Sequence, residues 1–342
     1  MTRTTPPTTI PAHRDTALRT MAGLATPMAI RVAATLRLAD HLAHTPKTVA
    51  ELATEVQADA ATLERLLRHL CTLGLVRSAS PGRYLATELA EPLRADDPGG
   101  LRARLDLNGA EGSADLAFVS LLHAVRTGQA AFPAHYGHSF WEHLADDPAL
   151  AASFHRRMGE AVETISGDIA AAYDWESAAH IVDVGGGNGA LLVGLLHRFT
   201  RLHGTVVDVS TAAGPARQAL TEAGVANRAQ FVQGDFFAPL PTGKGVYVLS
   251  AVLHNWNDAH ARLILQRCAE AAGPGGTVLV IEKIGADGES ATTEEDLRMV
   301  AYFGARERGL AEISALAEAA SCEVFAMHAA GSYAIVELTV RT

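Results

Sequence analysis

Residues 180–190 read HIVDVGGGNGA, and this stretch decides the fold of the second half of the chain. The apolar residues Ile181, Val182 and Val184 predict a buried strand, and a helix rich in Leu and Ala follows from Ala190. Between them, four of the five positions 185–189 are glycine, which lets the backbone turn tightly and approach a ligand closely. Free amides at the start of the following helix favour a negative group. The stretch therefore predicts a ligand-binding turn.

Two classes of cofactor fit such a turn, dinucleotides and S-adenosylmethionine. Gly185, Gly187 and Ala190 satisfy the dinucleotide fingerprint, and Asp208 follows about 20 residues later, where a ribose-binding acid belongs. Asp183, however, precedes the first glycine inside the strand and would repel a pyrophosphate. The same carboxylate would stabilise a cationic sulfonium and its amino group. Asp183 therefore favours S-adenosylmethionine, and a nicotinamide-dependent dehydrogenase is the alternative.

Short apolar strands alternate with helices from about residue 178 to the end of the chain. This alternation predicts an α/β fold with a doubly wound, mostly parallel sheet. The last two predicted strands, 322–329 and 332–340, are joined by a short turn, so we expect them to be antiparallel neighbours. A terminal antiparallel hairpin favours a Rossmann-like class I methyltransferase sheet over a dinucleotide-binding domain.

The N-terminal half is predicted to be mainly helical, from residue 16 to about residue 172. Segment 29–42 carries apolar residues on more than one helical face, which indicates burial against a partner subunit. Two helices and a hairpin with Pro81-Gly82 at its tip then predict a winged helix.

Winged helices often bind DNA, but the charge pattern argues against that role. Residues 1–100 hold 11 basic and 10 acidic residues, and the second predicted helix offers only Arg65, Arg68 and His69 against Glu64. A surface that binds nucleic acid normally concentrates positive charge. We therefore expect a scaffold for a homodimer, with no nucleic-acid partner.

The sequence divides into four predicted parts, and its composition indicates a soluble cytoplasmic protein. The net charge is −10, the three cysteines form no C-x-x-C pair, and no signal peptide or long apolar run indicates secretion or a membrane partner. The predicted parts are a disordered tail (1–15), a winged-helix-like dimerisation domain (16–100), a helical linker and acceptor-pocket region (101–176), and an S-adenosylmethionine-binding methyltransferase domain (177–342).

Six ordered motifs give the chain a family resemblance that covers roughly residues 18–340. It resembles the small-molecule O-methyltransferases of the caffeate and bacterial polyketide-tailoring type, which use S-adenosylmethionine and form homodimers through their N-terminal domains. The motifs are VDVGGGNGA (182–190), VVD (206–208), QGDFF (233–237), LHNWND (253–258), a Gly-Gly turn into VLVIEK (275–283) and GARERG (304–309).

The resemblance and the residue chemistry together imply a cofactor site at the ends of the predicted strands. An acid at a strand end can accept both ribose hydroxyls, and an acid beside an aromatic ring suits the amino group and face of adenine. The residues assigned to the cofactor are Asp183, Gly185 and Gly187 in the glycine turn, Asp208 for the ribose, Asp235 and Phe236 for adenine, and Ser250, whose backbone meets the methionyl amino group.

His254 is the predicted catalytic base, because the resemblance places Glu282 and Glu307 around it. A phenol has a pKa of about 10, as in tyrosine, so its hydroxyl is a poor nucleophile at neutral pH until a base removes the proton. Two carboxylates would orient the imidazole and stabilise its protonated form. The resemblance implies no metal, and His135 and His138 lack the acidic or cysteine neighbours of a metal site.

The predicted acceptor is a small aromatic molecule. The resemblance implies that four residues line its pocket: Asn255, Phe154, Met158 and Met299. The sequence departs from the family's usual motifs at three places. Asn255 stands where Asp is common, and Gly309 stands where Thr is common; these two departures affect the acceptor pocket. Residues 208–210 read DVS where the family usually has DLP. The leading hypothesis is methylation of a phenolic hydroxyl in secondary metabolism. Methylation at carbon or nitrogen, and a relative that binds the cofactor without methylating, are the alternatives.

Overall fold

The structure is a computed structural model that describes residues 12–243, 245–285, 287–290 and 292–342. The chain divides into two compact units, residues 1–112 and 113–342. The predicted disordered tail, 1–15, lies mostly outside the described residues, and helix α1 begins at Ala12. The four-part division drawn from the sequence stays a prediction.

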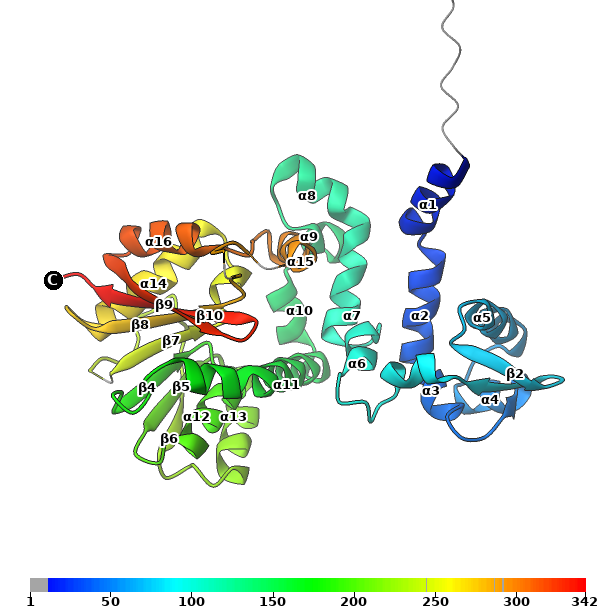
Figure 1. The fold of residues 1–342 in the computed structure, drawn as a ribbon, viewed down its shortest axis with the longest axis horizontal. Coiled ribbons are helices and arrows are strands. Elements are labelled where there is room, and N and C mark those ends of the chain that lie inside the picture. The colour runs from blue at the N-terminus through cyan, green and yellow to red at the C-terminus, as the bar shows by residue number, and fades with distance from the viewer. Residues whose placement is uncertain (1–11, 244, 286, 291) are drawn as a thin grey trace, which may run out of the picture. The chain divides into compact units, whose positions relative to one another are not determined.

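The N-terminal unit contains the predicted winged helix (Figure 1). Helices α4 and α5 lie between β1 and β2 of a small antiparallel sheet with the order β1-β3-β2, and Leu63, Leu67 and Leu70 bury one face of α5. Thr48 and Glu51 form a capping box at α4, and this reciprocal pairing satisfies otherwise unpaired helix amides. The elements are α1 (Ala12–Ala22), α2 (Ala25–Thr35), α3 (Leu38–His41), β1 (Lys47–Thr48), α4 (Val49–Glu55), α5 (Ala60–Thr72), β2 (Val76–Ser80), β3 (Arg83–Ala86), the 3-10 helix η1 (Glu88–Leu93), α6 (Leu101–Leu105) and α7 (Ala110–Ala114), which crosses the division.

The predicted continuous helix over 29–42 was wrong. Helix α2 ends at Thr35, and Arg37 adopts a left-handed conformation with φ of 55° before α3 begins. This break turns Leu38 and Leu42 into the core of the same unit, where they are fully buried. Their apolar character therefore needs no partner subunit. Three exposed apolar residues lie close together earlier in the chain, at Leu18, Met21 and Leu24.

The second unit is built on a seven-stranded sheet with the order β6-β5-β4-β7-β8-β10-β9 (Figure 1). The first five strands are parallel, whereas β10 runs antiparallel to both β8 and β9. The predicted class I methyltransferase sheet with its terminal hairpin is confirmed. The strands are β4 (His180–Val184), β5 (His203–Asp208), β6 (Ala229–Gln233), β7 (Val246–Ser250), β8 (Thr277–Glu282), β9 (Cys322–Ala330) and β10 (Tyr333–Val340).

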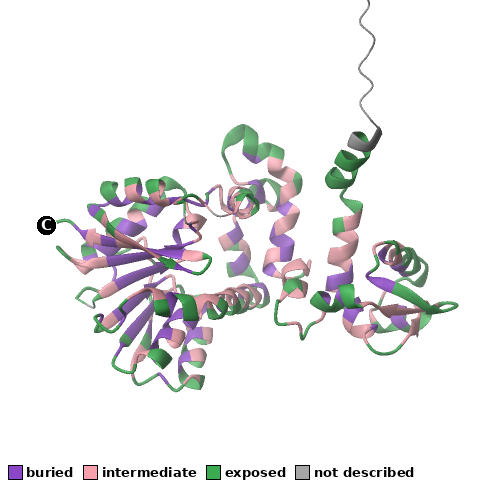
Figure 2. Ribbon diagram, in the orientation of Figure 1, coloured by how far each residue is buried: buried purple, intermediate pink, exposed green. Residues whose placement is uncertain are grey.

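Helices cover both faces of this sheet, so its inner strands are buried on both sides (Figure 2). Alternate residues of one strand face opposite cores: Leu249 packs with α14 and α16, whereas Val248 packs with α11, α12 and α13. These helices are α11 (Pro148–Ala172), α12 (Ala190–Arg198), α13 (Ser210–Glu222), α14 (Asp258–Ala272) and α16 (Leu310–Ala319).

The remaining helices of the second unit are short and flank the ends of the strands. Cys268 and Cys322 are buried and Cys71 is half-buried, all three as free thiols. No helix among the described residues is long and apolar enough to span a bilayer. The remaining helices of the second unit are η2 (Asp115–Ser120), α8 (Leu121–Thr127), α9 (Ala131–Tyr136), α10 (Phe140–Asp146), η3 (Leu253–Asn255) and α15 (Thr293–Phe303).

Candidate active site

The candidate site lies where the sheet reverses its strand order. Strand β4 lies between β5 and β7, and the chain leaves it in one direction for β5 and β6 and later in the other for β7 and β8. Ligands of open α/β sheets bind outside the carboxyl ends of the strands at such a switch point. The glycine turn follows β4 there, and Gly185 and Gly187 adopt φ of +74° and +56°, a region that residues with a Cβ rarely enter.

Asp183 is buried under this turn with only 2 % of its surface exposed. Among the described residues neither of its carboxylate oxygens has a hydrogen-bond partner. A Cβ on Gly186 would lie 2.4 Å from Oδ2, so only glycine fits above the carboxylate. Burial, with a smaller contribution from Asp208, raises the pKa of Asp183 to about 7. An unpaired buried carboxylate of this kind fits a cationic ligand group.

Asp208 ends β5 and stabilises the glycine turn. Its Oδ2 accepts a hydrogen bond from the Gly187 amide at 2.7 Å, and its Oδ1 accepts one from the Val209 amide at 2.7 Å. Burial raises the pKa of Asp208, although these two amides and the nearby His155 oppose the shift. Each carboxylate oxygen can accept more than one hydrogen bond, so the predicted contact to ribose hydroxyls remains available.

The residues predicted to hold adenine and the methionyl group lie at the next strand ends. The Phe236 ring approaches the glycine turn so closely that a Cβ on Gly185 would lie 3.4 Å from its Cε1. Asp235 is exposed, and its Oδ1 accepts a hydrogen bond from the Phe237 amide at 2.9 Å. Ser250 ends β7, and its buried hydroxyl has no partner among the described residues.

The fold brings His254, Glu282 and Glu307 together from three separate segments. His254 lies in η3 after β7, Glu282 ends β8, and Glu307 follows α15. The His254 Nδ1 atom lies 3.3 Å from Glu282 Oε2 and 3.2 Å from Glu307 Oε1. The histidine side chain is 16 % exposed, whereas the carboxylates are 3 % and 2 % exposed. One ring nitrogen therefore faces two buried acids, which leaves Nε2 for a ligand.

The electrostatics of these groups favour a basic histidine. Burial alone would lower the pKa of His254, but Glu282 and then Glu307 outweigh it and raise the pKa above its ordinary value. Burial also raises the pKa of Glu282. Burial opposes ionisation of Glu307 too, yet its contact with His254 and the nearby Lys283 and Arg308 hold its pKa below the usual range. Glu307 is therefore the carboxylate that stays ionised beside the imidazole.

The same cluster has the composition of a metal site, which the sequence did not suggest. One potential ligand atom from each of His254, Glu282 and Glu307 lies within 4.8 Å of the other two. The three residues are far apart in the chain, so no ligand spacing could be recognised. The cluster can thus serve either as a histidine base supported by two acids or as a set of three metal ligands. Measuring the activity with and without a chelator distinguishes these two roles.

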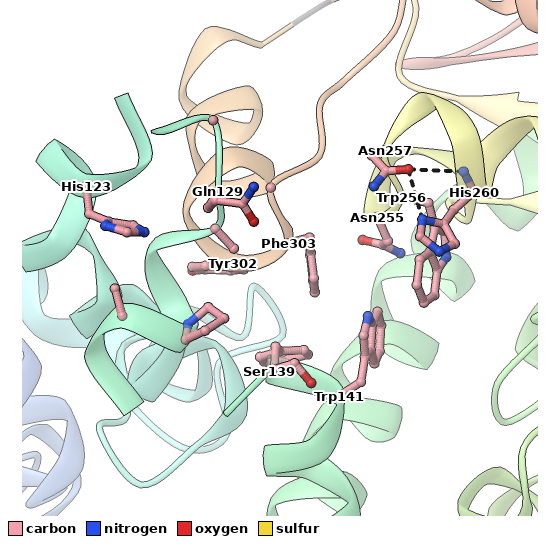
Figure 3. Close-up of a pocket in the computed structure, with 16 residues that line it drawn as sticks. His123, Gln129, Ser139, Trp141, Asn255, Trp256, Asn257, His260, Tyr302 and Phe303 are labelled. Atoms are coloured by element: carbon pink, nitrogen blue, oxygen red, sulfur yellow. Dashed lines mark hydrogen bonds between the residues drawn. The ribbon is translucent and has the colours of Figure 1, made fainter. Parts of the chain in front are cut away.

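Figure 3 shows a cavity of about 630 Å³ with aromatic side chains in its lining. Asn255 and Trp256, the two residues that follow His254, line it, and the Asn255 amide donates a 3.2 Å hydrogen bond to the Ala251 carbonyl. Trp141 lies between Trp256 and Phe303, with ring centroids 5.8 and 5.2 Å away and interplanar angles of 13° and 16°. Flat, nearly parallel rings therefore form one part of the cavity lining.

Of the four predicted acceptor residues, only Asn255 lines this cavity. Phe154 lies on α11 behind the wall, where its ring contacts those of Phe140 and Trp141 edge-on. Met158 is half-buried on the same helix, and Met299 is buried on α15. Large apolar helix residues usually serve the core, and sequence alone could not separate that role from contact with a ligand.

Sequence reasoning missed three contributors to the site. Gly159 allows α11 to approach the glycine turn, since a Cβ there would lie 2.2 Å from the Asn188 amide nitrogen. His155, one turn earlier, lies beside Gly187, and burial lowers its pKa. Trp141 forms the cavity wall. A glycine in the middle of a 25-residue helix was the one signal that could have marked α11 as a neighbour of the turn.

The family models identify both halves of the chain. Residues 118–323 match the O-methyltransferase domain, and residues 18–96 match the O-methyltransferase dimerisation domain. The 2,7-dihydroxy-5-methyl-1-naphthoate 7-O-methyltransferase of Streptomyces carzinostaticus is 52 % identical over 322 residues, which cover 94 % of this chain and 97 % of that relative. Aclacinomycin 10-hydroxylase RdmB of Streptomyces purpurascens is 41 % identical over 95 % of this chain and 90 % of its own length.

A solved structure agrees with the sequence relatives. NcsB1, an O-methyltransferase from neocarzinostatin biosynthesis, was crystallised with S-adenosylmethionine and 2-hydroxy-5-methyl naphthoic acid. It superposes with a TM-score of 0.91 at 51 % identity, over 94 % of this chain and 98 % of that one. The chain therefore belongs to the O-methyltransferase family and is an S-adenosylmethionine-dependent O-methyltransferase.

Proposed function

We propose that this enzyme methylates a phenolic hydroxyl of a naphthoate-type aromatic acid in secondary metabolism, with His254 as the general base. The observation that carries the proposal is the contact of His254 Nδ1 with two buried carboxylates, beside a cavity walled by aromatic rings. The named substrate of the relative from Streptomyces carzinostaticus and the acid bound to NcsB1 support the acceptor class.

The contacts of His254 support separate tasks for its two ring nitrogens. With Nδ1 protonated and facing Glu282 and Glu307, Nε2 carries the lone pair and can take the phenol proton. The imidazolium that forms is stabilised by the adjacent carboxylates, of which Glu307 stays ionised. Proton removal during attack converts a weak nucleophile with a pKa of about 10 into a phenolate.

The residues that would hold the cofactor fit its charge. S-Adenosylmethionine supplies a methyl group on a sulfonium that needs no further activation. Asp183 supplies the buried negative charge that this cation and its amino group require, and it has no other partner among the described residues. Asp208 would accept the ribose hydroxyls, Asp235 and Phe236 would bind adenine, and the end of β7 at Ser250 would meet the methionyl amino group.

The shape of the cavity favours a fused, planar acceptor. Trp141, Trp256 and Phe303 stack on one another in the cavity lining, and a flat aromatic ligand can extend such a stack. Asn255 offers an amide at the same wall, one residue from the base. We expect Trp141 to limit how far a bicyclic ring can enter.

Product analysis tests the proposal directly. The enzyme is incubated with S-adenosylmethionine and a panel of hydroxynaphthoates and simple phenols, and the products are examined by mass spectrometry and NMR. We expect hydroxynaphthoates to react best and to gain one methyl group on oxygen. A methyl on carbon or nitrogen would replace the proposed acceptor atom. Addition of an oxygen atom would match the named activity of the 10-hydroxylase relative instead.

We also propose that the enzyme is a homodimer assembled through its N-terminal unit. The match to the dimerisation domain covers residues 18–96. Leu18, Met21 and Leu24 are 66 %, 82 % and 70 % exposed, so three large apolar side chains meet water between residue 18 of α1 and residue 24, which caps the start of α2. Exposed apolar clusters of this kind mark protein interfaces.

Charge placed in this cluster should dissociate the dimer. The wild-type protein should scatter light with twice the 36.0 kDa mass of one chain, whereas the double variant Leu18→Glu, Met21→Glu should approach the monomer mass. Phe325→Glu is the matched control, because Phe325 is 73 % exposed on strand β9 of the other unit. A double variant that stays dimeric, or a monomeric wild type at micromolar concentration, would contradict the proposed interface.

A further inference from the structure

Arg308 follows the proposed acid Glu307 directly, yet its side chain contacts the segment that carries His254. It is only 2 % exposed. Its Nη1 donates to the Leu253 carbonyl at 2.7 Å, and its Nη2 donates to the Trp256 carbonyl at 2.7 Å. These carbonyls lie on either side of His254, in the segment 253–258 that we name the His254 loop.

The remaining contacts of Arg308 fix the guanidinium in place. Its Nη2 and Nε donate to Asp258 Oδ1 at 2.8 and 3.2 Å, and a longer contact of 3.5 Å joins Nη1 to the Arg306 carbonyl. On the other side, the Glu307 amide donates to Asp296 Oδ1 on α15 at 2.8 Å. The segment 304–309, which we name the Glu307 loop, is thus tied both to α15 and to the His254 loop.

The planar guanidinium is suited to this task because its donors lie in a rigid fork. Two of its nitrogens, held at a fixed spacing, reach two carbonyls three residues apart, whereas the three donors of a lysine ammonium all lie on one nitrogen at the end of a flexible stem. Arg308 is therefore a buried link between the two loops, which bring His254 Nδ1 to 3.2 Å from Glu307 Oε1.

We propose that Arg308 is a positioning residue for the proton transfer, and that it holds His254 against Glu307 by fastening the carbonyls of Leu253 and Trp256. It does not face the reacting atoms and takes no proton. The inference rests on the proposed role of His254 as the base. Because Arg308 acts through geometry, its positive charge alone is not sufficient.

Arg308→Lys tests this distinction, because it keeps the charge and loses the fork. We expect kcat to fall about 10–100-fold, the usual cost of a misplacement of about 1 Å at a catalytic group, with cofactor affinity unchanged. The pKa of His254, followed by NMR titration of its imidazole and assigned with His254→Ala, should fall toward the ordinary value of about 6.5. Arg308→Gln keeps a planar donor group but has no charge, and kcat and the pKa of His254 are measured for this variant as well.

Two neighbours serve as controls for charge and for the ion pair. Arg306 also contacts Asp258, at 3.3 Å, but is 45 % exposed, so Arg306→Met should leave kcat and the pKa of His254 unchanged. Asp258→Asn should also have little effect, since the asparagine Oδ1 can still accept from Arg308 and both carbonyl contacts of Arg308 remain. Wild-type kcat with an unchanged His254 pKa in Arg308→Lys would overturn the inference, as would equal damage from Asp258→Asn. If His254→Ala retains activity, the proposed base is wrong. The NMR titration of His254 in Arg308→Lys still tests whether Arg308 positions the imidazole, because it does not depend on activity.

Discussion

His254→Ala should lower kcat by roughly 10²–10⁴-fold, the usual contribution of a positioned general base. Cofactor affinity should stay nearly unchanged, because the proposed cofactor contacts lie on β4, β5 and β6 and at the end of β7. Steady-state kinetics with a hydroxynaphthoate and calorimetry with S-adenosylmethionine measure the two quantities separately. His328→Ala is the matched control, since His328 also pairs with a glutamate, Glu337 at 2.9 Å, but on the terminal hairpin.

The pH profile gives the same prediction a second readout. Only neutral His254 can accept the proton, and its two carboxylates raise its pKa, so kcat should rise with pH through a value above 6.5. Glu307→Gln removes one negative charge, so this limb should move to lower pH while the plateau falls. Near-full activity of His254→Ala would refute the base. Loss of wild-type activity on addition of a chelator would instead favour the use of the cluster as a metal site.

Asp183→Asn should weaken the binding of S-adenosylmethionine by about 3–5 kcal/mol, the cost of removing one partner from a buried ion pair. The wild-type affinity should also depend on pH. Because the pKa of Asp183 in the free protein is about 7 and a bound cation favours the carboxylate, affinity should increase as pH rises toward 7 and level off above it. Calorimetry at several pH values should show this dependence in the wild type and its loss in Asp183→Asn.

The same substitution should stabilise the ligand-free protein at alkaline pH. The raised pKa means that the folded protein holds a proton that the unfolded chain releases near pH 4, so the contribution of Asp183 to the free energy of unfolding is lost as pH rises to about 7. Asparagine cannot ionise, and we expect it to gain up to about 4 kcal/mol at pH 8, because the rise in the pKa of Asp183 from 3.8 to about 7 is worth about 1.4 kcal/mol per pKa unit.

Asp208→Ala is the contrasting variant for both measurements. It should weaken cofactor binding by about 1.5–3 kcal/mol, the range for hydrogen bonds to a charged group. It should not stabilise the free protein, because it leaves the Gly187 and Val209 amides without their acceptor. Unchanged affinity in Asp183→Asn, or no gain in its stability at pH 8, would contradict the proposed role of the buried carboxylate.

Local sequence determined the elements whose signals are short in range. The strand, glycine turn and helix at 180–198 follow from apolar residues, from glycines that accept positive φ and from a helix-forming run. The terminal hairpin follows from a connection too short for a parallel crossover. In such segments the residues that specify the structure are neighbours in the chain, so one sequence contains the required information.

Tertiary structure alone decided the features that depend on distant residues. The resemblance named His254, Glu282 and Glu307 together, but their 3.2–3.3 Å contacts exist only because β7, β8 and the segment after α15 end at one edge of the sheet. The break at Arg37 buried Leu38 and Leu42 within their own unit, which helical periodicity could not show. Packing also placed Phe154 behind the cavity wall and directed Arg308 onto the His254 loop. Side-chain direction over such distances is set by which helices and strands meet, and no local pattern in the sequence encodes it.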